Sequence, residues 1–168
     1  AHYEDMLTST GTFRYPMSGS SYTGSMRDYY LEASYGQFEV VCSVAGWYTS
    51  SQNFAYYSDG YGSRADELVA EAVLQADADV DYRNFDNDGD GYAEAIFVVH
   101  AGPGAEELPE PERWYYIWSH ASGAVYEICD STVIDYYSTE PQTGKIGVFC
   151  HEFGHQLGTG PFLPEEIS

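Results

Sequence analysis

The chain has few basic residues, few cysteines and no long apolar run. Its 168 residues include 6 Lys and Arg against 27 Asp and Glu, which gives a formal net charge of −21 at pH 7. Nucleic-acid-binding proteins contact the phosphate backbone through Lys and Arg, so this balance argues against a nucleic-acid partner. The same excess of negative charge disfavours binding to an anionic membrane surface. No apolar run approaches the roughly 18 residues of a transmembrane helix, so we expect no membrane span.

The three cysteines, Cys42, Cys129 and Cys150, permit one disulfide and leave one thiol unpaired. They form no CxxC pair and are too few for a small disulfide-stapled scaffold. Cys150 precedes His151, but we expect it to face the core as a small apolar residue. The hydrophobic content of 43% and the chain length suit a globular core, so we expect residues 1–168 to form one domain.

The most informative segment is GVFCHEFGHQLG at residues 147–158, which contains His151, Glu152 and His155 as an HExxH motif. Residues i and i+4 of a helix lie on the same face, so both imidazoles can bind one tetrahedral Zn²⁺ at roughly 2.0–2.1 Å. The Glu152 carboxylate can then take a proton from a zinc-bound water. The motif predicts a zinc hydrolase with His151 and His155 as metal ligands and Glu152 as the catalytic base.

Apolar residues at helical spacing surround the motif and predict a buried helix face behind the ligands. They are Ile146, Val148, Phe149, Cys150, Phe153 and Leu157. A plain amphipathic helix is the alternative, but it leaves Gly154 and Gly158 unexplained. In metzincin peptidases, the glycine of HExxHxxG ends the helix and turns the chain toward the metal with a third ligand. Gly158 fits this position.

In the sequence FDNDGDGYAEA, Asp86, Asp88 and Asp90 alternate with other residues and Glu94 follows. Oxygen ligands at every second position, in a turn that glycines permit, suit Ca²⁺. The twelfth position of an EF-hand loop would be Phe97, so Glu94 would have to serve from a shorter loop. A solvated Asp-Gly turn before a strand is the alternative. Repulsion between the crowded carboxylates favours a structural calcium site.

The remaining pattern predicts an α/β (α+β) fold with a twisted mixed sheet, a backing helix and the HExxH active-site helix. We expect loops at residues 1–24 and 101–113. Capping residues and apolar stripes predict helices at 26–34 and 63–78. Strands are expected at 37–44, 95–100, 114–119 and 125–135, with 95–100 at the centre of the sheet because it is apolar throughout.

Four blocks in this order resemble the immune inhibitor A family of secreted bacterial and archaeal zinc metallopeptidases. They are SMRDYYLEASYGQFEVVCSVAGWY at 25–48, NFDNDGDGYAEAIFVVHAGPGAE at 84–106, IWSHAS at 117–122 and IGVFCHEFGHQLG at 146–158. The resemblance implies a metzincin-like, extracellular endopeptidase with a catalytic zinc, structural calcium and protein or peptide substrates. By position, His151 and His155 resemble the zinc ligands, Glu152 the general base, and the carboxylates of 86–94 a calcium site.

His100 and His120 also fall in these blocks, but we expect buried, hydrogen-bonded histidines at strand ends, with contact to the substrate or transition state as the alternative. After HExxHxxG the resemblance predicts an acidic third ligand in a segment like LPDxYD, whereas this chain reads TGPFLPEEIS. Pro161 offers no donor side chain, and Glu165 and Glu166 are the only carboxylates there. The sequence therefore leaves the third zinc ligand unidentified.

The leading hypothesis is a secreted zinc metalloendopeptidase that hydrolyses peptide bonds in proteins. One alternative is a truncated or degenerate peptidase-like domain that binds metal ions or partners without catalysis. A second is an acidic calcium-binding adhesion module, whose stability would depend on the ion but not on zinc.

Overall fold

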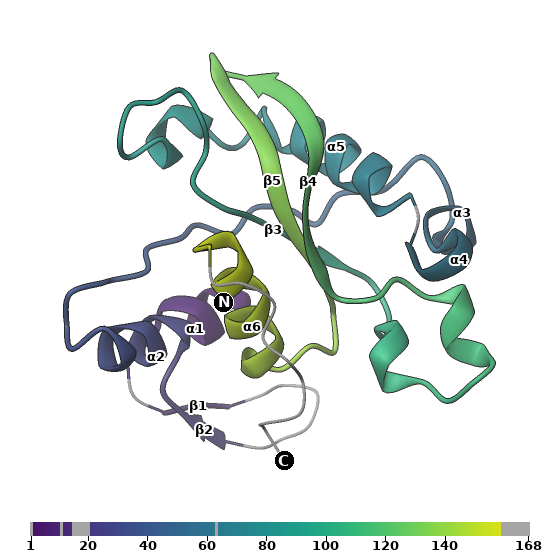
Figure 1. Cartoon of the computed structure of the whole chain (residues 1–168), viewed down its shortest axis with the longest axis horizontal. Coiled ribbons are helices and arrows are strands. Elements are labelled where there is room, and N and C mark those ends of the chain that lie inside the picture. Colours follow the sequence, from purple (N-terminus) through teal and green to yellow (C-terminus); the bar gives the residue numbers. More distant parts are fainter. Residues whose placement is uncertain (1, 11, 15–20, 63, 159–168) are drawn as a thin grey trace.

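The computed structural model describes residues 2–10, 12–14, 21–62 and 64–158. They form an α+β architecture, in which helices pack on an open mixed sheet (Figure 1). The sheet has the order β3-β5-β4 and consists of β3 (Ile96–His100), β5 (Thr132–Pro141) and β4 (His120–Cys129). β3 runs parallel to β5, and β4 is antiparallel to it. The predicted α+β fold with a mixed sheet is confirmed.

The helices and the small second sheet are short elements around this core. The α-helices are α1 (His2–Thr8), α2 (Met26–Ala33), α3 (Phe54–Tyr57), α4 (Asp59–Gly62), α5 (Ala65–Ala76) and α6 (Ile146–Gln156). The 3₁₀ turns are η1 (Tyr82–Phe85), η2 (Ala105–Glu107) and η3 (Glu112–Tyr115). β1 (Thr12–Arg14) and β2 (Ser21–Thr23) pair antiparallel in a sheet of their own. Among the described residues, no helix is long and apolar enough to cross a membrane.

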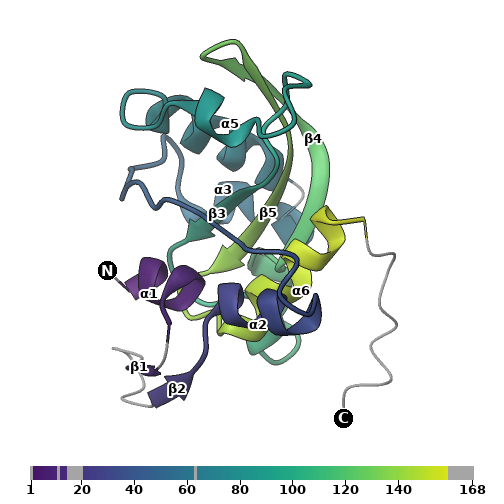
Figure 2. The same ribbon diagram turned by 90° about the vertical axis from the view of Figure 1, so that its left-hand side faces the viewer.

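Helices cover both faces of the three-stranded sheet. Val98 of β3 packs in one core with Val69 of α5, whereas Val99 packs in a second core with Phe149 of α6. Because successive side chains of a strand point to opposite faces, α5 and α6 lie on opposite sides of the sheet. Figures 1 and 2 both show α1 and α2 beside α6 and away from α5. The sheet is therefore the middle layer, with the HExxH helix on one side of it.

The helix predictions rest on local signals and agree with the structure. Ser25 caps α2 in a reciprocal capping box with Asp28, as its position before the apolar pattern indicates. α5 carries the predicted buried stripe, although Ser63, its expected cap, lies outside the described residues. The expected loop at 1–24 was wrong for its first residues, because α1 forms there and buries Met6 and Leu7 against α6 and α2.

The strand predicted at 37–44 is wrong: none of the strands that the structure describes pairs with these residues. The side chains do alternate, since Val40 is 6% exposed in the α6 core and Val41 is 79% exposed. However, this segment and β3 both line a cavity of about 1150 Å³, and no backbone hydrogen bonds join them. A side-chain pattern without a neighbouring backbone does not make a strand.

Three other strand expectations need correction. β3 forms where 95–100 was predicted, but it lies at an edge, because β5 occupies the centre of the sheet. Residues 114–119 form no strand, since they begin within η3 and continue irregularly to the start of β4. The weak strand at 125–135 is in fact a hairpin, with β4 and β5 joined at residues 130 and 131. Asp130 and Ser131 both have positive φ, 51° and 69°; aspartate is common at the first position of such a turn, but Ser131 stands where glycine is usual.

The cysteines remain free thiols in this fold. Cys150 packs at the margin of the α6 core, as expected, and Cys42 packs against the same core. Burial raises the pKa of Cys150 to about 12, so that its thiol stays neutral and behaves as an apolar group.

The hairpin turn yields a stability prediction. Ser131→Gly is expected to raise the free energy of unfolding by about 1 kcal/mol, because a non-glycine residue at positive φ carries steric strain of that order. Ser131→Val at the same site should lower it, since a β-branched residue tolerates this φ less well. Urea unfolding of the two variants and the parent chain measures both effects. Equal midpoints for all three would show that the turn carries no such strain.

Candidate metal centre and active site

The two histidines of HExxH project from one face of α6. Their Nε2 atoms lie 3.1 Å apart, and the ring planes are nearly perpendicular. Two imidazole nitrogens bound to a tetrahedral Zn²⁺ at roughly 2.05 Å would be about 3.3 Å apart. His151 and His155 therefore fit a shared zinc ion with little movement. Burial lowers the pKa of His151, and nearby His155 lowers it further, which favours the neutral imidazole that binds metals.

Glu152 lies between the ligand face of α6 and strand β4. It is only 6% exposed, and its carboxylate accepts a backbone hydrogen bond from Ala121. Burial raises the pKa of Glu152, and the carboxylate of Glu106 raises it too, whereas His155, His120 and the Ala121 bond act in the opposite direction. A carboxylate with a raised pKa has a greater proton affinity, which suits a general base near neutral pH.

A pocket of about 280 Å³ opens beside the motif. It is lined by Glu106, Trp118, Ser119, Gly147, Val148, His151 and Glu152. The larger cavity of about 1150 Å³ includes α6 residues but none of the three motif residues. Of these two cavities, the smaller is the one lined by both a metal-ligand candidate and the candidate base.

Glu106 and Ser119 belong to this pocket but were missed by the sequence analysis. The hydroxyl and backbone N–H of Ser119 both donate to the Glu106 carboxylate, the latter at 3.3 Å. Glu106 falls in the loop predicted at 101–113, whereas in the structure it is half-buried in η2. Both residues fall in sequence blocks that resemble the family, and this resemblance is the feature of the sequence that could have identified them.

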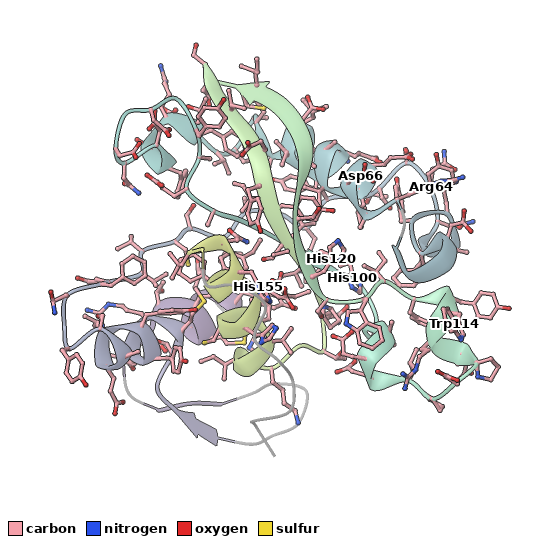
Figure 3. The ribbon with its side chains drawn as sticks, in the orientation of Figure 1. Arg64, Asp66, His100, Trp114, His120 and His155 are labelled. Atoms are coloured by element: carbon pink, nitrogen blue, oxygen red, sulfur yellow. The ribbon has the colours of Figure 1, made fainter. Side chains whose placement is uncertain are left out.

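His100 and His120 lie close together, apart from His155 on α6 (Figure 3). His100 is 5% exposed at the end of β3, and its Nδ1 lies 3.1 Å from the carbonyl oxygen of Ala101. His120 is half-buried at the start of β4, with Nδ1 2.7 Å from the Trp118 carbonyl oxygen and Nε2 3.3 Å from the Tyr137 hydroxyl. Both are hydrogen-bonded strand-end histidines, as expected, but of the two only His100 is also buried.

The acidic loop brings Asp86, Asp88 and Asp90 together, with one carboxylate oxygen of each within 4.8 Å of the others. The loop's own N–H groups turn these side chains inward: Gly89 donates to Asp86 at 2.8 Å, and Tyr92 donates to Asp90 at 2.9 Å. Gly89 and Gly91 have φ of 77° and 90°, which only glycine adopts readily. Glu94 is not in this group, because its carboxylate accepts from the N–H of Asn87 at 2.8 Å.

Gly158 follows α6 with φ of 79°. This left-handed conformation lets the chain leave the helix in a new direction, as the HExxHxxG pattern predicts. Glu165 and Glu166, the carboxylates expected after the turn, lie outside the described residues.

The chain was compared with known proteins. A family model described as the catalytic domain of immune inhibitor A peptidase M6 matches residues 1–167. The pre-pro-metalloprotease PrtV of two Vibrio cholerae serotype O1 strains is 31% identical over 199 residues, which cover 99% of this chain and 21% of PrtV. Immune inhibitor A of Bacillus thuringiensis subsp. alesti is 28% identical over 200 residues, which cover 98% of this chain and 28% of that protein.

The chain thus spans less than a third of the length of either relative. The family match, by contrast, extends over nearly all of its residues and includes the helix that carries His151, Glu152 and His155. The chain belongs to the immune inhibitor A family of M6 peptidase catalytic domains.

Proposed function

We propose that this chain carries the catalytic site of a secreted, zinc-dependent metalloendopeptidase that hydrolyses peptide bonds in proteins. The observation that carries the proposal is the convergence of the His151 and His155 Nε2 atoms, 3.1 Å apart, beside buried Glu152. Membership of the peptidase family supports it, and so does the name of the Vibrio relative, a metalloprotease. Secretion is proposed from the family resemblance.

The mechanism follows from the positions of the motif residues. His151 and His155 would hold the zinc ion, which would supply a Lewis acid for the substrate carbonyl and for a water molecule. Glu152 accepts the proton of the attacking water, because its carboxylate faces the pocket and burial raises its pKa. Glu152 then passes this proton to the leaving amine. Trp118 and Val148 provide apolar surface beside the reacting bond.

The rival proposal is a peptidase-like domain that binds ions or partners without catalysis. Its support is that a catalytic zinc has three protein ligands in most enzymes. Within the described ranges, only Asp86, Asp88 and Asp90 form a group of three or more potential metal-binding side chains. A third ligand from Glu165 or Glu166 would complete the zinc site, and Gly158 gives the chain the turn that such a return needs.

The metal ligands can be tested by substitution. His151→Ala and His155→Ala are each expected to abolish stoichiometric zinc binding, because either change leaves one imidazole at the site. His120→Ala is the matched control and should keep the metal, since its ring nitrogens contact Trp118 and Tyr137 instead. Elemental analysis after dialysis against trace zinc gives the readout. Full zinc content in both α6 variants would remove these histidines from the site.

The general base can be tested in the same protein. Glu152→Gln should keep its zinc but lose hydrolysis of a casein-type substrate by a factor of about 10² or more, because the amide cannot accept the proton. Glu32→Gln, which changes an exposed residue of α2, controls for the loss of one charge. Undiminished activity in Glu152→Gln would exclude the assigned role. A parent protein whose zinc is bound but whose hydrolysis is absent would favour the rival proposal.

We also propose that Asp86, Asp88 and Asp90 bind a structural Ca²⁺ ion. The support is that the three carboxylates converge within 4.8 Å although like charges repel. Backbone hydrogen bonds hold the Asp86 and Asp90 oxygens in place before any ion arrives, which lowers the entropic cost of binding. In this geometry Glu94 supports the loop through Asn87 rather than joining the three aspartates.

Calcium binding predicts a shift in thermal stability. Calcium at about 1 mM should raise the melting temperature, because a ligand bound only by the native state stabilises that state by mass action. The Asp88→Ala and Asp90→Ala double variant should lose this rise. A double variant of the exposed residues Glu110 and Glu112, also to alanine, removes the same charge and should keep it. An equal rise with magnesium, or in the Asp88 and Asp90 variant, would indicate general charge screening.

A further inference from the structure

Glu140 is a carboxyl group with no exposed surface, next to the last residue of the central strand β5. It pairs with Val99 of β3, so its side chain lies on the sheet face that α6 covers. Glu140 therefore lies beneath the helix that carries the HExxH motif. Burying a carboxyl group costs free energy unless hydrogen bonds or charges compensate. The burial of Glu140 in this core therefore suggests that the residue has a specific role.

The surroundings of Glu140 determine its protonation. Burial raises its pKa well above the usual value, the carboxylates of Glu152 and Glu106 raise it further, and a hydrogen bond from Ser138 opposes the rise. Glu152 comes from α6 and Glu106 from η2, and no cationic side chain is among the groups that act on Glu140. Burial and the two neighbouring carboxylates therefore favour the neutral acid form of Glu140.

The two oxygens of Glu140 have different partners. Oε1 accepts a hydrogen bond from the Ser138 hydroxyl at 2.6 Å. Oε2 is buried and has no hydrogen-bond partner among the described residues. Since a neutral carboxyl group has one O–H and Oε1 acts as the acceptor, Oε2 carries the proton and is a donor in need of an acceptor. Of the two carboxylates that act on Glu140, that of Glu152 has the larger effect.

We propose that Glu140 is a positioning residue that stays protonated and donates a hydrogen bond from Oε2, through one buried water, to the Glu152 carboxylate. Buried polar groups that lack a direct partner are commonly bridged by an ordered water, at little cost in affinity. Ala121 holds the same carboxylate from β4. A second donor from β5 fixes its rotation and leaves the other Glu152 oxygen to the attacking water. An ionised Glu140 would instead repel Glu152, so the role requires the neutral form.

This inference rests on the proposed role of Glu152 as general base, and substitutions in the full native protein test it. Glu140→Gln keeps an acceptor for Ser138 and places an N–H donor where the hydroxyl was, so kcat should stay close to that of the parent. Glu140→Leu has a similar volume but no donor. Its kcat should fall about 10- to 100-fold with little change in KM, as for other residues that orient a catalytic group through hydrogen bonds. A purely structural role would not separate kcat from KM, nor would glutamine rescue it.

Two measurements do not depend on activity. Infrared spectroscopy at pH 7 should show the carbonyl band of a protonated carboxylic acid, and Glu140→Gln should remove it. The second measurement is the difference in melting temperature between Glu140→Gln and the parent. It should grow as pH rises above 4.5, because the unfolded chain then releases the Glu140 proton while the folded chain retains it.

The outcomes are distinct. If Glu152→Gln is fully active, the proposed function fails whatever Glu140 does. If Glu152 is required but Glu140→Leu keeps the parent kcat, only the inference about Glu140 fails. If Glu140→Leu does not fold, the infrared band and the pH dependence of Glu140→Gln still decide, since an ionised Glu140 at pH 7 overturns the proposal.

Discussion

The site depends on the packing of α6 against the sheet, because one helix both anchors itself and carries the motif. Phe149 and Phe153 are four residues apart and pack on Phe97 of β3, with ring centroids 6.1 and 5.6 Å away. His151 and His155 follow each phenylalanine by two residues, which is about 200° around a helix. The anchoring face and the metal-binding face are therefore opposed. Any shift of the aromatic contacts would move the two imidazoles by a similar amount, since all four residues belong to one rigid helix.

Electrostatics set a second constraint on this centre. Glu106, Glu140 and Glu152 come from η2, β5 and α6, and all three influence one another in a protein of net charge −21. Hydrogen bonds to each carboxylate, together with His155 and His120 near Glu152, offset this repulsion. Ser119 holds Glu106, Ser138 holds Glu140, and Ala121 holds Glu152. A divalent cation at His151 and His155 would lower the repulsion further, so an acidic surround favours retention of the metal.

Local patterns predicted the parts of the fold that local interactions determine. The capping box of α2, the stripe of α5 and the motif of α6 each depend on residues a few positions apart. Strand pairing instead depends on segments that are distant in the sequence. Residues 37–44 alternate as a strand would, yet none of the described strands pairs with them, and the hairpin at Asp130 and Ser131 has serine where glycine is usual. The same division holds in the site. HExxH spacing alone brings its three residues together on one helix, whereas Glu106, Ser119 and Glu140 come from distant segments that only the folded sheet places near α6.

The acidic loop is connected to the site through the sheet, but none of its residues lines the pocket. It is joined to β5 at Val133, whose N–H donates to Gly91 at 2.8 Å and whose carbonyl oxygen accepts from Ala93 at 2.9 Å. The same loop leads into β3, and β3 pairs in parallel with the far half of β5, which ends at Pro141 just before α6. An ion held by Asp86, Asp88 and Asp90 would thus fix the start of two neighbouring strands, whereas the motif lies on α6, which packs across one face of the sheet. The ion would affect the reaction by ordering the sheet beneath α6, because none of the three aspartates lines the pocket.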